Sequence, residues 1–215
     1  MKIKVFALGG SVFTENLDKL EEYAEAFESF DEQIVIVTGA GKLKENILAA
    51  EEVGNQAELD LIGIKATRLN AQTLKTAIES HSKTPQTPEE VQEVASTGKN
   101  FVMGGLVPGY STDAVAATVA ELLDAELYIA TSIHGVHSRD PDHPEAEKLD
   151  KVTTGKLREI VSGNNQAGKH DLIDGTAIGI IERSEIPTRV FRGIPENISK
   201  PEKVEGTDIV PTQKR

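Results

Sequence analysis

The feature that most constrains the fold is a regular alternation of short apolar runs with longer helical patterns. Strand-like runs at residues 2–8, 33–37, 101–103, 126–131, 188–191 and 207–210 alternate with helix-like stretches at 16–27, 42–53, 58–80, 88–98, 114–123, 153–161, 171–184 and 195–199. This order favours a mostly parallel sheet with helices on both faces. We therefore expect an α/β fold, a three-layer αβα sandwich. With 215 residues and no visible linker, one domain is the simplest organisation.

One helical pattern carries a set of large apolar residues. Leu61, Ile64, Leu69 and Leu74 recur through residues 58–80 at spacings that fit a helix packed on the core. We expect these four side chains to be buried. Asp60 lies near the start of the same pattern, where it can act as a cap, face solvent or face a ligand.

Four strand-like runs end in a glycine-rich or polar turn. These turns begin at Gly9, Gly39, Gly104 and Thr131. The carboxyl ends of parallel strands meet at one edge of the sheet, where such folds bind ligands. Glycine lets a ligand approach the backbone closely, and free N–H groups at a helix start favour anions. The sequence therefore predicts one anion site at this edge.

The third of these turns is the most informative. After Gly104 and Gly105, the chain passes Pro108 to reach a helix start for which Ser111 or Thr112 is the expected N-cap. An acid in the first turn of the helix fits the positive end of the helix dipole. We expect this stretch to hold the phosphate end of a small substrate.

The second turn matches neither common nucleotide motif. Leu43 follows Gly41 and Lys42 where a P-loop, with wider glycine spacing, places Ser or Thr, and Lys44 with Glu45 stands where a dinucleotide fingerprint has its third glycine. The turn is thus a second glycine-rich strand-to-helix turn without an assigned ligand.

Composition excludes several function classes. The formal net charge of -12 argues against a binder of nucleic-acid polymers. There is no apolar run of about 18 residues, so we expect no membrane span, and a cytoplasmic protein is the simplest inference. The chain has no cysteine, and His134 and His137 lack further ligands that would complete a metal set. We expect no metal site built from protein ligands alone.

The turns and their neighbours resemble a known family. Residues 9–12, 38–42, 60–71, 104–117 and 131–141 together resemble the amino acid kinase family, and within it the archaeal-type uridylate (UMP) kinases. The most specific parts are residues 108–116 and 67–71, whereas residues 173–177 look more like the bacterial UMP kinases. The resemblance covers nearly the whole chain.

This resemblance implies an activity and an assembly. It implies the amino acid kinase fold as a single domain over 1–215, whose N-terminal part binds the acceptor and whose C-terminal part binds ATP. The reaction would move the γ-phosphoryl group of ATP to UMP with Mg²⁺, in pyrimidine nucleotide (CTP) biosynthesis. The implied assembly is a homohexamer, a trimer of dimers, in the cytoplasm.

The resemblance also assigns roles to residues. Gly10 and Ser11 would cradle the transferred phosphates, Asp60 would bind the ribose hydroxyls of UMP, and Asp174 would organise cations around the phosphates. The implied UMP-binding residues are Ala40, Asp60, Leu106, Val107, Pro108, Gly109, Tyr110, Ser111 and Thr112. The implied ATP-binding residues are Gly9, Gly10, Ser11, Gly41, Thr131, Ser132, His137 and Asp140.

Several positions depart from the family pattern. Ala7, Glu45 and Gly179 stand where many relatives carry a lysine, an arginine and a lysine, and His134 and His137 replace an aspartate and a tyrosine. The first three changes remove positive charge from a site that must hold phosphates.

Three cations of the chain can replace the lost charge. We hypothesise that Lys42, Lys44 or Arg68, together with Mg²⁺, supplies it, with Lys42 and Lys44 in catalytic roles. Arg68 can equally be a solvated helix residue. Two other functions stay open: a kinase of the same fold acting on a carbamate, an acyl carboxylate or isopentenyl phosphate, and a non-catalytic nucleotide-binding relative.

Overall fold

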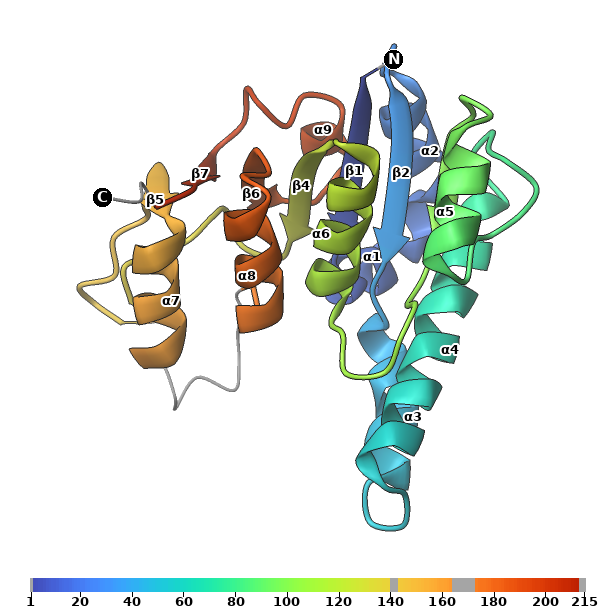
Figure 1. The fold of residues 1–215 in the computed structure, drawn as a ribbon, viewed down its shortest axis with the longest axis horizontal. Coiled ribbons are helices and arrows are strands. Elements are labelled where there is room, and N and C mark those ends of the chain that lie inside the picture. The colour runs from blue at the N-terminus through green and yellow to red at the C-terminus, as the bar shows by residue number, and fades with distance from the viewer. Residues whose placement is uncertain (1, 140–142, 164–172, 213–215) are drawn as a thin grey trace.

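The computed structural model describes residues 2–139, 143–163 and 173–212. A seven-stranded sheet runs through them in the order β3-β2-β1-β4-β6-β7-β5 (Figure 1). Neighbouring strands from β3 to β6 are parallel, β7 is antiparallel to β6, and β5 is parallel to β7. The mostly parallel sheet is confirmed. The strands are β1 (Ile3–Leu8), β2 (Gln33–Thr38), β3 (Phe101–Met103), β4 (Glu126–Thr131), β5 (Lys151–Thr153), β6 (Thr188–Arg192) and β7 (Gly206–Val210).

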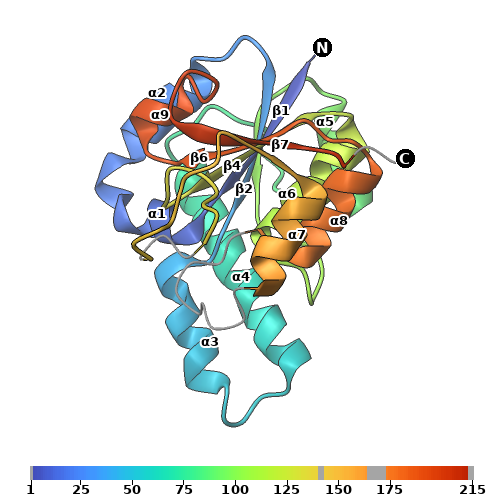
Figure 2. The same ribbon diagram turned by 90° about the vertical axis from the view of Figure 1, so that its left-hand side faces the viewer.

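Helices cover both faces of this sheet, which confirms the αβα sandwich. The helices are α1 (Gly10–Glu15), α2 (Leu20–Glu28), α3 (Lys44–Ala50), α4 (Gln56–Lys75), α5 (Pro88–Ala95), α6 (Thr112–Leu123), α7 (Thr154–Gly163), α8 (Gly175–Arg183) and α9 (Pro195–Ile198). In Figure 2 the sheet is seen nearly edge-on, with α1, α2 and α9 on one side and α5 to α8 on the other. None of the helices in the described ranges has the length and apolar character needed to cross a membrane.

The core consists of two apolar clusters, one on each face of the sheet. Along β1, Val5 and Ala7 belong to the cluster under α5 to α8, whereas Phe6 and Leu8 belong to the cluster under α1, α2 and α9. Successive side chains of a strand point to opposite faces, so a strand covered on both faces is apolar at every position. This explains why the central strands are visible in the sequence as unbroken apolar runs.

Two elements were not expected from the sequence. The chain enters α1 directly after Gly9, whereas the first helix was expected at residue 16; in the structure a 3-10 turn at Leu17–Lys19 and α2 follow α1. The N-cap of α1 makes no side-chain hydrogen bond, so its start carries no capping signal. Strand β5 has three residues, of which Val152 alone is buried, and is therefore too short to show a pattern.

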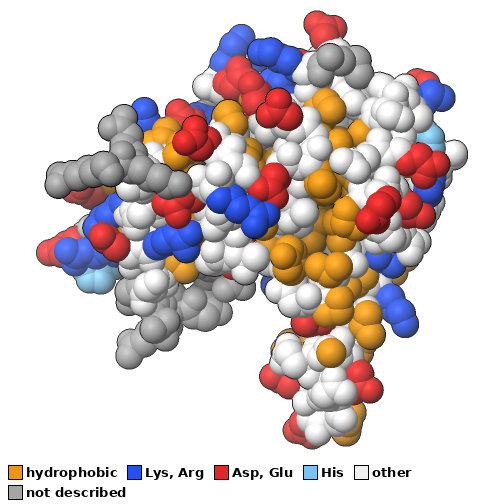
Figure 3. Space-filling view, viewed as in Figure 1, with side chains coloured by type: hydrophobic (Ala, Val, Ile, Leu, Met, Phe, Trp, Pro, Cys, Tyr) orange, Lys and Arg blue, Asp and Glu red, His pale blue; other side chains and the backbone are white. Residues whose placement is uncertain are grey.

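Helices α3 and α4 form a hairpin that projects beyond the carboxyl edge of the sheet (Figures 1 and 2). The expected burial is confirmed for Ile64 and Leu74 but wrong for Leu61 and Leu69, which are 48% and 57% exposed. Leu61 lies toward the start of α4, in the projecting hairpin, whereas Leu69 lies on the helix face opposite to the buried Ile64 and Leu74. Apolar side chains form a band on this side of the molecule that continues onto the hairpin (Figure 3).

Candidate functional site

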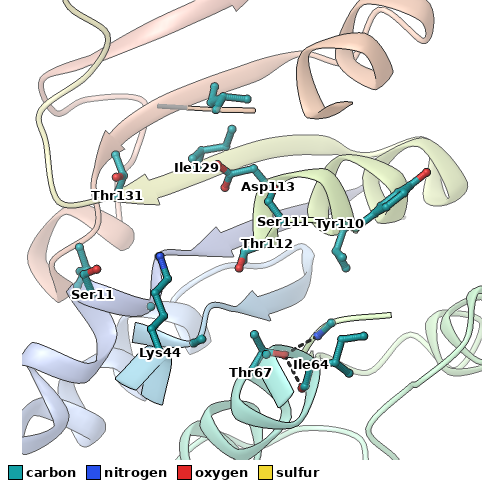
Figure 4. Close-up of a pocket in the computed structure, with 18 of the residues that line it drawn as sticks. Ser11, Lys44, Ile64, Thr67, Tyr110, Ser111, Thr112, Asp113, Ile129 and Thr131 are labelled. Carbon is teal, nitrogen blue, oxygen red and sulfur yellow. Dashed lines mark hydrogen bonds between the residues drawn. The ribbon is translucent and has the colours of Figure 1, made fainter. Parts of the chain in front are cut away.

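A cavity of about 460 Å³ lies at the carboxyl edge of the sheet. Segments that follow β1, β2, β3 and β4 all contribute to its wall, and the first half of α4 closes one side (Figure 4). The expected meeting of four turns at one edge is therefore confirmed. The volume lies in the range of small-molecule sites.

The first two turns touch through their backbones. A Cβ atom on Gly10 would lie 2.1 Å from the backbone nitrogen of Gly41, and one on Gly39 would lie 2.5 Å from that of Gly10. Gly41 also has a φ of +55°, in the left-handed region that favours glycine. Thr14 joins the turns further, because its hydroxyl donates to the carbonyl of Gly10 at 2.8 Å and accepts from the N–H of Lys42 at 3.1 Å. This contact brings the amides of both turns to one place.

Helix α4 fixes the second and third turns with two buried polar side chains that the sequence analysis did not assign. The amide of Asn70 donates to the carbonyls of Gly39 at 2.7 Å and Ala40 at 3.0 Å. The hydroxyl of Thr67 accepts from the N–H of Gly105 at 2.7 Å, as Figure 4 shows. Both residues stand at positions of α4 where helical spacing predicts burial. A polar side chain that is buried requires a hydrogen-bond partner, so such positions in the sequence indicate a contact of this kind.

The loop at residues 106–111 is held at two points. Near its middle, the N–H of Gly109 donates to Asp60 Oδ2 at 2.8 Å. At its end, the Ser111 hydroxyl accepts from the N–H of Ala114 at 3.1 Å, so Ser111, one of the two expected candidates, is the N-cap of α6. The Ser111 hydroxyl also donates to Asp174 Oδ2.

Asp174 is the N-cap of α8. Its Oδ1 accepts from the N–H groups of Thr176 at 2.7 Å and Ala177 at 3.1 Å. The hydrogen bond from Ser111 therefore joins the caps of α6 and α8. Both helices direct their positive dipole ends toward this junction, which favours a nearby anion.

The three candidate cations occupy different surroundings. Lys44 lines the cavity, and in Figure 4 its ammonium group extends toward the space between Ser11 and Thr112. Lys42 is exposed outside the lining. Arg68 donates to the carbonyl of Gly105 at 3.1 Å and to the side chain of Gln86 at 2.8 Å, and it is also outside the lining. The geometry therefore favours Lys44 among the three.

The structure brings together most of the candidate site residues named from the sequence. Those that line the cavity are Gly9, Gly10, Ser11, Ala40, Lys44, Asp60, Val107, Gly109, Tyr110, Ser111, Thr112, Thr131 and Ser132. Those outside its lining are Gly41, Lys42, Leu106, Pro108, His137 and Asp174. Asp140 lies outside the described residues.

The two histidines after β4 differ in their environment. His134 lies beside Arg192, at 3.4 Å, and its Nδ1 is 3.4 Å from a carboxylate oxygen of Glu205. His137 pairs with Lys148 in an isolated bridge, and its buried Nδ1 has no hydrogen-bond partner within the described ranges. Neither histidine lies in the cavity wall.

The remaining wall residues are mainly apolar. Val12, Ile47, Leu59, Ile64, Val115, Ile129, Ile133, Ile173 and Val190 line the cavity. In the sequence these residues have the same pattern as core residues, so nothing distinguishes them. Together they exclude water from part of the site, which strengthens polar interactions there.

The carboxylates near the cavity suit a metal ion that is bound together with nucleotide phosphates. No group of three or more His, Asp or Glu residues in the part of the chain that the structure describes could hold a metal ion. Mg²⁺ bound to nucleotides commonly takes one or two carboxylates, with phosphate and water oxygens for the rest. Asp174, hydrogen-bonded to the cavity residue Ser111, can supply such a carboxylate, so the residues present fit Mg²⁺ bound with a nucleotide.

The fold and the cavity define a class of protein. The fold is an αβα sandwich whose central strands are parallel. Its cavity lies at the carboxyl edge, is lined by glycines and has two helix N-termini beside it, features that suit a phosphorylated small molecule. Comparison with known protein families identifies the family to which the chain belongs. The chain belongs to the amino acid kinase family, whose model matches residues 2–192.

Individual relatives are similar over nearly their whole length. The uridylate kinase of Archaeoglobus fulgidus is 43% identical over 218 residues, which cover 98% of this chain and 99% of that protein. The uridylate kinase of Methanococcus aeolicus is 39% identical, with 93% and 94% covered. The crystal structure of the Archaeoglobus fulgidus enzyme superposes with a TM-score of 0.88 at 41% identity, covering 98% of this chain and 100% of that one. The resemblance to the archaeal-type uridylate kinases is confirmed.

Proposed function

We propose that this chain transfers the γ-phosphoryl group of ATP to UMP, giving UDP and ADP, as a step of pyrimidine nucleotide biosynthesis. The observation that carries the proposal is near-full-length similarity to archaeal uridylate kinases, combined with one cavity that joins the four turns. The single domain spans residues 1–215. Its N-terminal part binds the acceptor and its C-terminal part binds ATP.

The two ends of the cavity would hold the two nucleotides. Asp60 and the loop at residues 106–111 form the acceptor end, where the second carboxylate oxygen of Asp60 can accept from a ribose hydroxyl while the first keeps Gly109. Thr131 and Ser132, at the end of β4, form the donor end. His137, Asp140 and Gly41 belong to the ATP side of the proposal.

Between these ends, the phosphates would meet the first turn. Gly10 and Ser11 line the cavity, and N–H groups at the start of a helix have no intrahelical acceptor. Lys44, whose ammonium group extends toward the space between Ser11 and Thr112, would add a positive charge. Because the acceptor is itself a phosphate anion, no general base is required, and catalysis reduces to alignment and neutralisation of charge.

Mg²⁺ would enter with ATP. When bound, it neutralises charge on the phosphate oxygens. Asp174 is the carboxylate of this chain that we assign to it, since its position at the α8 cap and its contact with Ser111 place it beside the cavity. Besides Mg²⁺, the backbone of the first turn and Lys44 would contact the phosphates.

A panel of acceptors tests the activity. Nucleoside monophosphates, a carbamate, an acyl carboxylate and isopentenyl phosphate are each incubated with ATP and Mg²⁺, and ADP release is measured. We expect rapid turnover with UMP. Turnover with a different acceptor alone would identify another kinase of the same fold, and nucleotide binding without turnover would identify a non-catalytic relative.

We also propose a homohexamer, a trimer of dimers, in the cytoplasm. Exposed leucines on the projecting hairpin support self-association, since Leu48 and Leu69 are 65% and 57% exposed. Light scattering coupled to gel filtration gives the mass in solution. A hexamer should be found for the unmodified chain and a smaller species for Leu69→Glu, whereas a monomer for both would exclude the assembly.

A further inference from the structure

We propose that Ser111 is a positioning residue that couples the acceptor loop to Asp174. Its hydroxyl donates to Asp174 Oδ2 and thereby sets the orientation of that carboxylate. The inference rests on the proposed function for the role of Asp174 beside the phosphates and Mg²⁺. It adds a connection between the two halves of the site.

The Ser111 oxygen performs two tasks at once. It accepts from the N–H of Ala114 at 3.1 Å, which caps α6, and it donates its proton to Asp174. A hydroxyl can do both because it has one donor and two acceptor positions. The accepted hydrogen bond fixes where the oxygen lies, so the donated bond has a defined direction.

Two different elements hold the two oxygens of Asp174. Oδ1 accepts from the N–H groups of Thr176 and Ala177 at the start of α8. Oδ2 accepts from Ser111, which is 63 positions away in the sequence. Oδ1 already accepts two hydrogen bonds from α8 and Oδ2 accepts only the one from Ser111, so Oδ2 keeps a lone pair for a cation. Ser111 therefore controls the orientation of the oxygen that would face Mg²⁺.

The acceptor loop connects this contact to the acceptor end. The N–H of Gly109 donates to Asp60, the residue that we assign to the ribose, and only Tyr110 separates Gly109 from Ser111. A nucleotide that engages Asp60 and orders the loop would thus also order Ser111. Binding of the acceptor would favour the Asp174 orientation suited to Mg²⁺ and ATP.

Variants at residue 111 remove or keep the hydroxyl, and a variant of another N-cap controls for the loss of a cap. Ser111→Ala removes both, whereas Ser111→Thr keeps both. Thr87→Ala is the matched control, since Thr87 caps α5 through the N–H of Glu90 and lies outside the cavity wall. Calorimetric titration with ADP at fixed Mg²⁺ and assays across Mg²⁺ concentrations measure the effect.

We expect Ser111→Ala to raise the Mg²⁺ concentration for half-maximal turnover and to weaken Mg²⁺-dependent ADP binding, each by roughly tenfold, the scale of a hydrogen bond to a charged group. Ser111→Thr should restore both values, and Thr87→Ala should match the unmodified protein. An unchanged Mg²⁺ dependence in Ser111→Ala would overturn the coupling.

A double-mutant cycle tests the contact without any nucleotide. Unfolding free energies of Ser111→Ala, Asp174→Asn and the double variant should be non-additive, because the two side chains share one hydrogen bond. Additive values would overturn the proposal. If the unmodified protein phosphorylated no monophosphate, the proposed function would fail, while the cycle and the ADP titration would still report on Ser111 and Asp174.

Discussion

The side-chain amide of Asn70, in the second half of α4, donates to the carbonyl of Gly39 at 2.7 Å and so ties the helix to the turn after β2. The same amide satisfies the carbonyl of Ala40, and the side chain is buried. The second turn is thus held by a residue that lies outside it. The second half of α4 therefore supports the site by holding this turn, although Asn70 itself does not line the cavity.

Replacement of Asn70 by Ala should destabilise the fold. The buried carbonyl of Gly39 would lose its donor, whereas that of Ala40 would keep the N–H of Leu43, and we expect a decrease of about 1–3 kcal/mol in the free energy of unfolding. Urea denaturation measures this value. Asn46→Ala is the control, because the Asn46 amide is exposed and contacts the carbonyl of Leu43 at 3.3 Å. A change below about 0.5 kcal/mol in Asn70→Ala would contradict the role of this helix.

A second prediction concerns the contact between the first two turns. Gly10→Ala places a methyl group 2.1 Å from the backbone nitrogen of Gly41, so the turns must separate. We expect a loss of turnover of about 100-fold, since positioning errors near 1 Å have effects of this size. Steady-state assays and circular dichroism distinguish lost activity from lost fold.

Gly179 provides the matched glycine control for that substitution. Within α8, a Cβ on Gly179 would meet only the end of the Arg158 side chain, at 3.6 Å. Gly179→Ala should therefore keep its activity and stabilise the fold by roughly 0.5–1 kcal/mol, the difference in helix propensity. Equal activities for Gly10→Ala and Gly179→Ala would show that the close approach of the turns is unimportant.

A third prediction separates the two lysines of the second turn. Lys44→Ala should lower kcat/KM by about 100-fold, a typical effect of removing one group that stabilises transition-state charge. Lys42→Ala removes the same charge from an exposed position outside the cavity wall and should change kcat/KM by less than about threefold. Comparable losses in both variants would indicate a general effect of charge, and no loss in either would leave the proposed cation without support.

A fourth prediction concerns the pH dependence of stability and a carboxylate at the opposite end of the sheet, Glu202. The hydroxyl of Tyr128, at 2.7 Å, and the ammonium of Lys4, at 2.9 Å, hold the pKa of Glu202 below its ordinary value. A carboxyl whose pKa is lowered on folding stabilises the fold above its ordinary pKa. That contribution is lost as the pH falls through the lowered value.

Glu202→Gln should therefore be less stable than the unmodified protein at pH 7 and equally stable in strong acid. The side chain of Glu202 is 60% exposed, so we expect a difference below about 1 kcal/mol. Denaturation across pH 2–8 measures the profile. Glu15→Gln removes a charge from an exposed position and serves as the control. A difference that persisted at low pH would show that charge is not its origin.

The parts of the fold that the sequence predicts are those with a local signal. Ser111, one of the two caps that side-chain type and a following acid indicate, is the N-cap of α6. The burial of Leu61 and Leu69 was predicted wrongly. Leu61 lies where α4 projects from the body, and Leu69 lies on the helix face opposite to the buried Ile64 and Leu74.

The parts of the site that the sequence misses depend on distant pairs. Four turns could be placed at one edge because strand direction alone decides it. The contact of Ser111 with Asp174 spans 63 positions, and no local pattern marks it. Similarly, the polar residues of α4 are visible in the sequence, but their partners in the turns emerge only when the sheet is assembled.

Helix α4 holds the neighbouring turns by hydrogen bonds to their main-chain atoms. Asn70 donates to two carbonyls, and Thr67 accepts from an N–H group. Hydrogen bonds to the main chain do not depend on the side chains of residues further along the turns. Substitutions such as that at Glu45 can then accumulate around the cavity while the loops keep their course. Substrate selectivity and reaction rate can therefore change between relatives while the main-chain path of the turns stays the same.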